Sequence, residues 1–415
     1  MLRVFYFFLI SVWVVFSLPI FLYRRFILKK KTPIWRKFIC PLLDQSLNAD
    51  VVWLHAVSLG EMKVAVPIIN KLKNDFRFDL IVTTQTETGY EHAKKMFHSN
   101  IYYMPIDFFW LQRAFIRKIR CKIFLLIESD FWLENLYQLR KDSAEIILLN
   151  GKMSNTSYAR WKKFPNLARY LFGKFDLCFV QNDDYLKKYS EFLDISKIEI
   201  CGNLKIAKEP QFNDSDLSRL DASKIVCIAC THEGEELELF EAIKGLINEN
   251  WVIFIAPRHP ERFNSVFFQL QKIHPDISRF SEKKSTSLVI VDQMGILNSI
   301  YKRSQIVVMA GSYCSKKGGH DIFEPILCGA FTYFGPYMHA QKELKKLALE
   351  HELGKEVNTH ELYSEIVMRD SKMLNREEFE TKVLNFRRNS SDGFNKVYSH
   401  LAEIFAKKNI KKITQ

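Results

Sequence analysis

After residue 31, short apolar runs alternate with stretches whose apolar residues recur at helical spacing. Runs of this kind, with few polar residues inside them, are typical of strands that are buried on both faces of a sheet. Six such runs lie in the first half of the chain, at residues 51–55, 80–84, 101–104, 123–127, 146–149 and 177–180. Because helical segments fit between them, the pattern predicts a parallel sheet with helices on both faces, an α/β domain.

The pattern breaks at residues 208–224, a polar and turn-prone segment, and a second series then begins. Its predicted strands are residues 225–229, 251–256, 287–291, 306–309 and 330–334, and its predicted helices are residues 233–248 and 321–327. Ligands of such sheets bind beyond the carboxyl ends of the strands. We therefore expect two doubly wound, Rossmann-like domains that face each other across a cleft, with one substrate on each side.

The N-terminus carries a different pattern, because residues 4–23 (VFYFFLISVWVVFSLPIFLY) contain no charge. At about 1.5 Å per residue, a helix of this length spans roughly 30 Å of hydrocarbon. A cleaved signal peptide is the alternative, but the RRFILKKK that follows lacks a small-residue cleavage site. We predict an uncleaved, single-pass anchor with the rest of the chain in the cytoplasm, held there by the basic residues Arg24, Arg25, Lys29, Lys30 and Lys31.

The predicted organisation has five parts. Residues 1–31 form the anchor and its basic flank, residues 32–207 the first domain, and residues 208–224 a linker. Residues 225–376 form the second domain, and residues 377–415 a helical segment that packs back on the first domain.

Composition fits a globular chain of two or more domains: of 415 residues, 47% are hydrophobic and 26% charged. These values exclude a mainly disordered chain and one with many membrane spans. The formal net charge of +13 favours an anionic partner, either a nucleic acid, a phosphorylated metabolite or an acidic lipid. Eight scattered cysteines indicate a reducing compartment. Cys227 and Cys230 form a C-x-x-C, but they lie in a predicted strand without a second pair, so a zinc or redox site is disfavoured.

In the first domain, residues 55–61 (HAVSLGE) follow a strand and begin a helix. Backbone amides near Ser58 and Gly60 could hold an anion, and the carboxylate of Glu61 is a candidate general base. The alternative is a helix cap, in which Ser58 accepts a backbone hydrogen bond and Glu61 acts on the helix dipole. Lys205, in the segment GNLK at residues 202–205, would face the predicted cleft from the end of the domain.

In the second domain, Gly318 and Gly319 follow a strand and precede a short helix. Paired glycines let a phosphate approach the backbone, and Glu324 could accept hydrogen bonds from ribose hydroxyls. Arg258 ends another strand, where its guanidinium could pair with a phosphate. A plain turn and a surface arginine remain the alternatives, because the spacing matches neither a P-loop nor a dinucleotide fingerprint.

Residues 108–120 (FFWLQRAFIRKIR) combine aromatic and basic side chains at helical spacing. This combination suits a surface that lies against anionic lipid. Nucleic-acid binding uses the same residue types, but no recognised module surrounds the segment, so no nucleic-acid partner is expected. A helix with a solvated basic face that merely covers the sheet is the other alternative.

Nine segments, taken in order, resemble the 3-deoxy-D-manno-octulosonic acid (Kdo) transferases of bacterial lipopolysaccharide synthesis, and they cover nearly the whole chain. They are residues 55–61, 83–89 (TTQTETG), 105–107, 128–132 (ESDFW), 150–154 (NGKMS), 202–205, 231–236 (THEGEE), 258–260 and 318–325. The resemblance implies an inverting GT-B glycosyltransferase. It would move Kdo from CMP-Kdo to a lipid A precursor (lipid IVA) at the bacterial inner membrane, with anionic lipid as a partner and without a metal or other cofactor.

The resemblance also implies residue roles. Glu61 matches the family's general base, and Glu128, Asp130 and Lys205 match groups that assist the transition state. The segments that match the CMP-binding parts of the family contain Pro257, Arg258, Met294, Gly295, Ile296, Gly318, Gly319, His320, Asp321, Ile322, Phe323 and Glu324.

Some positions depart from the family pattern. The family has Arg at Lys152, an acidic residue at Ile296 and near Ala207, and Asn at Asp321. An isoleucine at 296 would remove a side-chain hydrogen bond to the ribose or the cytidine. Two other functions stay open: another GT-B transferase or epimerase that uses a UDP-sugar, and an anchored, non-catalytic relative that binds acidic phospholipid.

Overall fold

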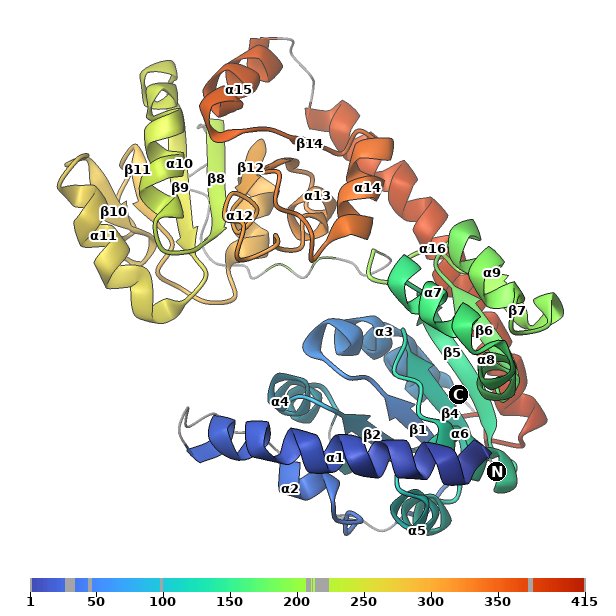
Figure 1. Ribbon diagram of the computed structural model, residues 1–415. Coiled ribbons are helices and arrows are strands. Elements are labelled where there is room, and N and C mark those ends of the chain that lie inside the picture. Colours follow the sequence, from blue (N-terminus) through green and yellow to red (C-terminus); the bar gives the residue numbers. More distant parts are fainter. Residues whose placement is uncertain are drawn as a thin grey trace. The chain divides into compact units, whose positions relative to one another are not determined.

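The computed structural model describes residues 2–26, 34–43, 47–97, 100–206, 210, 212, 224–371 and 376–413. Its two compact units are each described separately below (Figure 1): the first contains Met1–Lys208 and Ser390–Gln415, and the second contains Glu209–Asn389. Most of the predicted linker, Lys29 to Lys31 of the predicted basic flank, and Ala207 lie outside the described residues.

The sheet of the first unit has seven strands in the order β3-β2-β1-β4-β5-β6-β7, all parallel. Its strands are β1 Val51–His55, β2 Asp79–Thr84, β3 Asn100–Tyr103, β4 Cys121–Ile127, β5 Glu145–Gly151, β6 Leu177–Val180 and β7 Ile198–Ile200. All six predicted strands form. The pattern missed β7, because three residues at the sheet edge are too short to show a period.

Helices cover both faces of this sheet. They are α3 Leu59–Asp75, α4 Glu87–Met96, α5 Phe109–Ile119, α6 Leu133–Lys141, α7 Asn155–Lys163, α8 Pro165–Phe172 and α9 Asp183–Ser190, with a short α2 at Ile34–Lys37. Successive strand residues point to opposite faces. Val51 and Trp53 therefore join one core with Phe115, whereas Val52 and Leu54 join the other. Because both faces of the sheet are buried, the strands are apolar throughout and do not alternate apolar with polar residues.

The last helix, α16 (Arg376–Lys407), ends on the first unit. Val397, Leu401 and Phe405 are fully buried there and belong to the core on the α3 side of the sheet. Phe405 also contacts the ring of Phe76, with 5.1 Å between the centroids. The C-terminal helix thus helps to cover this face of the first sheet.

The second unit also contains a seven-stranded parallel sheet, in the order β10-β11-β9-β8-β12-β13-β14. Its strands are β8 Lys224–Thr231, β9 Trp251–Pro257, β10 Ile277–Arg279, β11 Leu288–Ile290, β12 Ile306–Met309, β13 Phe331–Phe334 and β14 Gly354–Glu356. Its helices are α10 Glu235–Ile243, α11 Phe263–Gln271, α12 Leu297–Arg303, α13 Phe323–Leu327, α14 Lys342–Glu350 and α15 Leu362–Ser371. The five predicted strands form, and the edge strands β10 and β14 were missed for the same reason as β7.

The first helix corrects a prediction. α1 (Leu2–Phe26) is helical, but no helix among the described residues combines the length and apolar character needed to cross a membrane, so the anchor predicted at residues 4–23 is not supported. α1 instead packs on the first unit beside α5 (Figure 1), where Ile10 contacts Phe108 and Leu111.

Polar contacts hold the same face of α1 in place. The Arg3 guanidinium donates to both carboxylate oxygens of Glu134, at 2.9 and 2.6 Å. The Tyr6 hydroxyl donates to Asp107 at 2.7 Å. Asp107 and Glu134 are both buried, so α1 supplies partners for two carboxylates that would otherwise be costly to bury.

Candidate half-sites in the two units

Each sheet has a point at which the strand order reverses, between β1 and β4 in the first unit and between β8 and β12 in the second. Open α/β sheets bind their ligands beyond the carboxyl ends of the strands at such points. Glu61 follows β1, and Glu128 and Asp130 follow β4. The loop that contains Gly318 and Gly319 follows β12. Each unit therefore brings predicted site residues to its own switch point.

Glu61 lies in the first turn of α3, and its carboxylate is half-buried. The N-cap Ser58 accepts a hydrogen bond from the Glu61 amide at 3.4 Å, and Glu61 Oε2 accepts one from the Val57 amide at 2.6 Å. The capping interpretation is thus correct for one oxygen. The other oxygen, Oε1, accepts no hydrogen bond from a described residue.

The pKa of Glu61 is raised to about 7, mainly by burial and then by the negative charge of Glu128, with a smaller contribution from Asp130. The Val57 amide and His55 act in the opposite direction. A carboxylate with this pKa and one free oxygen can accept a proton near neutral pH. Capping and base chemistry are therefore compatible at this residue.

Glu128 is buried and has a left-handed backbone, with φ of 64°. Its carboxylate forms ion pairs with the ammonium groups of Lys205, at 2.9 Å, and Lys152. Burial alone would raise the pKa of Glu128, but the two lysines hold it below its ordinary value. Glu128 is therefore ionised. It holds the two ammonium groups in place and is not poised to accept a proton.

The Gly202–Lys205 segment is fixed against the end of β5. Gly202 has a φ of 69°, and the Leu204 amide donates to the Asn150 side chain at 3.0 Å. The Asn203 side chain accepts from the Lys205 amide at 3.1 Å. These bonds direct Lys205 to Glu128.

Asp130 is oriented by three donors: His55 Nε2 and Trp132 Nε1, each at 2.8 Å from Oδ2, and Gln85 Nε2 at 3.4 Å. Although burial would raise the pKa of Asp130, the hydrogen bond and the charge of His55 together with the bond from Trp132 lower it. His55 Nδ1 lies 2.8 Å from Thr83 Oγ1, which also accepts from Trp53 Nε1 at 2.8 Å.

These contacts suggest hydrogen-bond roles for the two nitrogens of the His55 ring. Because the Thr83 oxygen accepts from Trp53, its own proton can point to His55 Nδ1, which leaves the Nε2 proton for Asp130. Sequence reasoning did not assign a role to His55, because a histidine at the end of a buried strand has the pattern of a core residue. Its position at the switch point, six residues before Glu61, was the available signal.

In the second unit, one buried carboxylate connects the loops after β8 and β12. Glu235 accepts from the His232 amide at 3.0 Å and from the Gly311 amide at 2.7 and 2.9 Å. The rings of His232 and His320 are stacked at 5.1 Å, with 2.9 Å between their Nε2 atoms. Since both nitrogens cannot donate, one ring donates and the other accepts.

Burial lowers the pKa of both histidines to about 4. The charge of Lys317 adds to this effect at His232, and the charge of Arg258 adds to it at His320. Both rings are therefore neutral at pH 7, and the unit gathers positive charge around them. His232 was not among the predicted site residues, since only the fold brings it to His320.

The glycine loop has the backbone that paired glycines permit. Gly318 and Gly319 have φ values of 82° and 85°. At Gly311, which has a φ of 73°, a Cβ would lie 2.6 Å from the His320 ring. Asp321 accepts from the Phe323 amide at 3.0 Å, just before α13 begins. Ile322 and Phe323 are buried, and Glu324 is half-buried in the first turn of α13.

The remaining predicted nucleotide-binding residues lie at the same edge of this sheet. Pro257 ends β9, and the amide of the exposed Arg258 donates to the Thr231 carbonyl at 3.0 Å. Met294 is 63% exposed, whereas Ile296 is 5% exposed. The Ile296 side chain thus belongs to the core and offers no polar group to a ligand.

No group of three or more His, Cys, Asp or Glu side chains in the described ranges is arranged to hold a metal ion. Cys227 is buried in β8, and the eight cysteines form no disulfide.

The two parallel-sheet units define the class. The chain is similar in fold to the crystal structure of a glycosyltransferase from Rickettsia africae ESF-5, with a TM-score of 0.52 and 13% identity over 87% of this chain and 99% of that one. The two parallel-sheet α/β units thus resemble the fold of GT-B glycosyltransferases.

Comparisons with a family model and with sequence relatives indicate the family that the chain resembles. Residues 25–208 match the family model for the 3-deoxy-D-manno-octulosonic-acid transferases. The 3-deoxy-D-manno-octulosonic acid transferase of Chlamydia trachomatis serovar A is 26% identical over 369 residues, which cover 85% of this chain and 86% of the relative. The Haemophilus influenzae transferase of the same name is 27% identical over 326 residues, 74% of this chain and 76% of the relative. Over most of its length the chain is similar to the Kdo transferases, as the sequence motifs predicted.

Proposed function

We propose that this protein transfers Kdo, with inversion, from CMP-Kdo to the lipid A precursor lipid IVA in the assembly of the lipopolysaccharide inner core. The first unit would bind the acceptor and the second unit the nucleotide. The observation that carries the proposal is Glu61, a carboxylate with a pKa of about 7 and one free oxygen at the switch point of the first sheet.

In the acceptor half, Glu61 takes the proton of the attacking sugar hydroxyl through its free oxygen. The ammonium groups of Lys205 and Lys152, held by Glu128, stabilise negative charge that develops as the reaction proceeds. Asp130, fixed by His55 and Trp132, accepts hydrogen bonds from other acceptor hydroxyls. Each of these groups is held by protein contacts before substrate binds, which is the arrangement that electrostatic catalysis requires.

In the donor half, the backbone amides of the glycine loop and the guanidinium of Arg258 bind the phosphate of CMP, with Lys317 adding positive charge nearby. These cations stabilise the charge on CMP as it leaves. Glu324 accepts from the ribose hydroxyls. Because Ile296 is a core residue, Met294 and Gly295 would contribute only backbone and apolar contacts. The proposal includes no metal and no other cofactor.

A paired comparison tests the base. Purified protein is incubated with CMP-Kdo and tetraacylated lipid A precursor, and CMP release and product mass are measured. We expect Glu61→Gln to lower turnover by about 10²–10⁴-fold, the usual effect of losing a general base, with CMP affinity unchanged. Glu91→Gln, an exposed carboxylate on α4, is the matched control and should keep full activity.

Three results would contradict the proposal. Full activity of the Glu61→Gln protein would remove this residue from the mechanism. No turnover of the wild-type protein with this pair, while UDP-sugars are consumed, would favour the alternative transferase or epimerase. No turnover with any sugar nucleotide, together with retained lipid binding, would favour a non-catalytic protein.

We infer further that the first unit lies against the bacterial inner membrane through the outer face of α1. Several large apolar side chains are exposed there, among them Phe5 (61%), Phe8 (62%) and Phe16 (75%). Phe109 and Trp110 of the neighbouring α5 are also about half exposed, at 46% and 45%. An exposed apolar face of this kind, with basic residues beside it on α5, suits the boundary between headgroups and acyl chains.

Vesicle flotation tests this contact. On vesicles that contain phosphatidylglycerol, replacing Phe8 and Phe16 together by Ser should lower the bound fraction at least about tenfold, because each phenylalanine contributes roughly 1.5–3 kcal/mol when it leaves water. Phe268→Ser, at a residue that is 56% exposed on α11, is the control and should leave flotation unchanged. Unchanged flotation of the double variant would place membrane contact elsewhere.

A further inference from the structure

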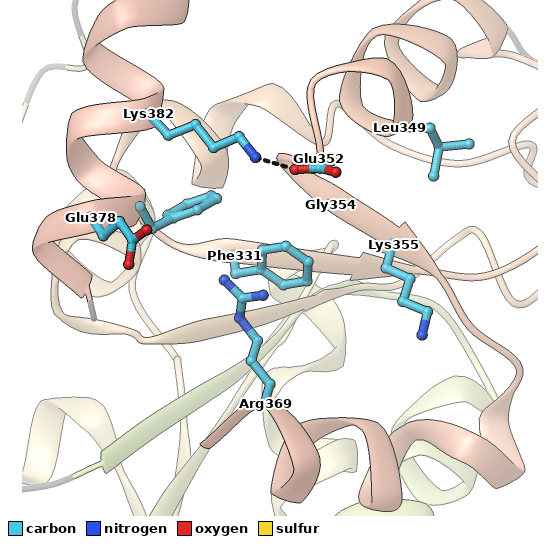
Figure 2. Close-up of a pocket in the computed structure, with 9 residues that line it drawn as sticks. Phe331, Leu349, Glu352, Gly354, Lys355, Arg369, Glu378 and Lys382 are labelled. Atoms are coloured by element: carbon cyan, nitrogen blue, oxygen red, sulfur yellow. Dashed lines mark hydrogen bonds and ion pairs between the residues drawn. The ribbon is translucent and has the colours of Figure 1, made fainter. Parts of the chain in front are cut away.

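The second unit contains a cavity of about 350 Å³ that takes no part in the proposed reaction. Its wall includes Phe331, the first residue of β13, and Gly354, the first residue of β14. The cavity thus lies at the amino ends of these parallel strands, whereas the predicted nucleotide-binding residues lie beyond the carboxyl ends. Side chains from α14, α15 and α16 complete it (Figure 2).

Arg369 of α15 is the central residue of this cavity. Its guanidinium carbon lies 3.4 Å from the ring centroid of Phe331 and 5.6 Å from that of Phe379. The two rings are each 7% exposed and meet edge to face at 5.6 Å. The guanidinium forms no hydrogen bond or ion pair with any described residue. Figure 2 shows it turned to the Phe331 ring within the cavity.

The half-buried guanidinium, without an ion-pair partner among the described residues, loses part of its hydration. Burial lowers the pKa of Arg369, which reports the loss of hydration of its charge. Stacking on an aromatic ring satisfies one face of the plane, but the N–H groups at its edge still require acceptors. A carboxylate or a phosphate that lies in the plane of the guanidinium can accept two of these hydrogen bonds at once.

Among the basic residues of the cavity wall, Arg369 alone has no ion-pair partner among the described residues. Lys382 forms an ion pair with Glu352, and Lys355 forms one with Glu365 at 2.7 Å. Glu378 lines the same cavity and has no ion-pair partner among the described residues, and it does not pair with Arg369. A ligand that meets both groups would carry an anionic group for Arg369 and a hydroxyl or ammonium group for Glu378.

We propose that this cavity binds a small organic anion whose carboxylate or phosphate pairs with Arg369. Its apolar part lies against Leu349, which is 41% exposed, and against the two phenylalanine rings. The volume is at the lower end of the range for small-molecule sites, so the ligand is small. Because the cavity is separate from the residues proposed to bind CMP, the ligand is an effector of the second unit rather than a substrate.

Calorimetric titration of the full chain tests the site with three probes: phenylacetate, phenyl phosphate and inorganic phosphate. We expect at least one ring-bearing anion to bind more tightly than inorganic phosphate. Arg369→Met, which keeps an apolar stem but removes the guanidinium, should weaken binding at least about tenfold. Arg369→Lys should restore only part of it, since an ammonium cannot make the bidentate contact.

Glu378→Gln separates ligand binding from a purely structural role of Arg369. Removing a negative charge from the cavity wall should tighten anion binding, whereas it would change nothing if Arg369 only supports Phe331. Lys272→Met, at the exposed C-cap position of α11, is the control and should bind as the wild-type protein does. A preference for phenylacetate would assign a carboxylate ligand, and a preference for phenyl phosphate a phosphate ligand.

If Arg369→Met folds poorly, the Arg369→Lys and Glu378→Gln proteins still test the proposal, because both variants keep a polar side chain in the cavity. No binding of any probe by the wild-type protein up to about 10 mM, a range that covers weak specific sites, would overturn the proposal. Equal binding by wild-type and Arg369→Lys proteins together with no change in Glu378→Gln would overturn it as well. Displacement of the probe by CMP would show that the cavity is not separate from the nucleotide site.

Discussion

Glu61 and Glu128 show how neighbouring carboxylates in one half-site acquire opposite properties. Glu128 is the more deeply buried of the two, yet its pKa is lowered because Lys205 and Lys152 lie against it. Glu61 has no cation within ion-pairing distance among the described residues, and burial together with the charge of Glu128 raises its pKa to about 7. Pairing rather than depth therefore decides which group can act as the base.

This difference predicts the pH dependence of the reaction. A general base must be deprotonated, so kcat/KM should fall about tenfold per pH unit below the pKa of Glu61, near pH 7, and level off above it. The groups that face Glu61 are His55, Glu128, Asp130 and the Val57 amide, and none of these carboxylates titrates in the same range. Initial rates between pH 5 and 9 measure the profile.

Glu61→Gln should lose this acid limb while keeping its low residual rate. If the acid limb of the wild-type profile is centred between pH 4 and 5 instead, the site does not raise the pKa of Glu61. Glu91→Gln should reproduce the wild-type profile.

Residues that act through a strand-to-helix turn could be recognised in the sequence, because the turn has its own local signature. Glu61 belongs to this class. His55, Lys152 and His232 do not, since each becomes meaningful only through a partner distant in the chain: Asp130, Glu128 and His320, respectively. The periodicity of apolar residues along the chain gives no sign of such a pair.

At the scale of elements, α16 shows where local propensity and packing disagree. Gly393 lies inside this helix, where alanine would normally be preferred by about 1 kcal/mol. A Cβ at this position, however, would collide with the carbonyl oxygen of Cys201. Backbone cannot yield as a flexible side chain can, so the glycine marks the close approach of α16 to the first unit.

We therefore expect Gly393→Ala to destabilise the first unit by roughly 1–3 kcal/mol, the usual cost of overpacking, instead of stabilising it. Urea denaturation monitored by circular dichroism measures the change in the free energy of unfolding. Asp392→Ala, the exposed neighbour in the same helix, should be neutral or slightly stabilising. A stabilised Gly393→Ala protein would mean that α16 does not dock closely on Cys201.

The elements that the sequence pattern missed or misjudged share a cause. β7, β10 and β14 each have three residues and form because a neighbouring strand already offers a hydrogen-bonding edge. α1 was predicted correctly as a helix, but the predicted membrane span is not supported among the described residues. Its inner face contacts Asp107 and Glu134, which lie more than a hundred residues away in the chain, and a hydropathy pattern cannot report such contacts.

At the scale of the whole molecule, each unit has its own sheet and its own buried apolar side chains, so each can unfold as a cooperative body. Because the proposed CMP site lies in the second unit alone, CMP should raise the midpoint of one of two calorimetric transitions and leave the other in place. At about one hundred times Kd, a ligand stabilises its unit by about 2.7 kcal/mol.

Arg258→Ala should reduce this shift, while Lys272→Met should retain it. Equal shifts of both transitions, or a single transition that moves as one, would contradict independent binding by the second unit.

The sequence by itself determined the fold class and most strands, because apolar periodicity and turn chemistry are local properties that each segment carries with it. It also marked Glu61, whose position after a strand can be read from a few residues. Only the tertiary structure decided which charges meet. It paired Glu128 with two lysines, stacked His232 on His320, placed α1 on two buried carboxylates, and left Arg369 beside two aromatic rings without a partner among the described residues. The pKa of a group depends on its burial and on charges a few ångströms away, and the fold alone sets both.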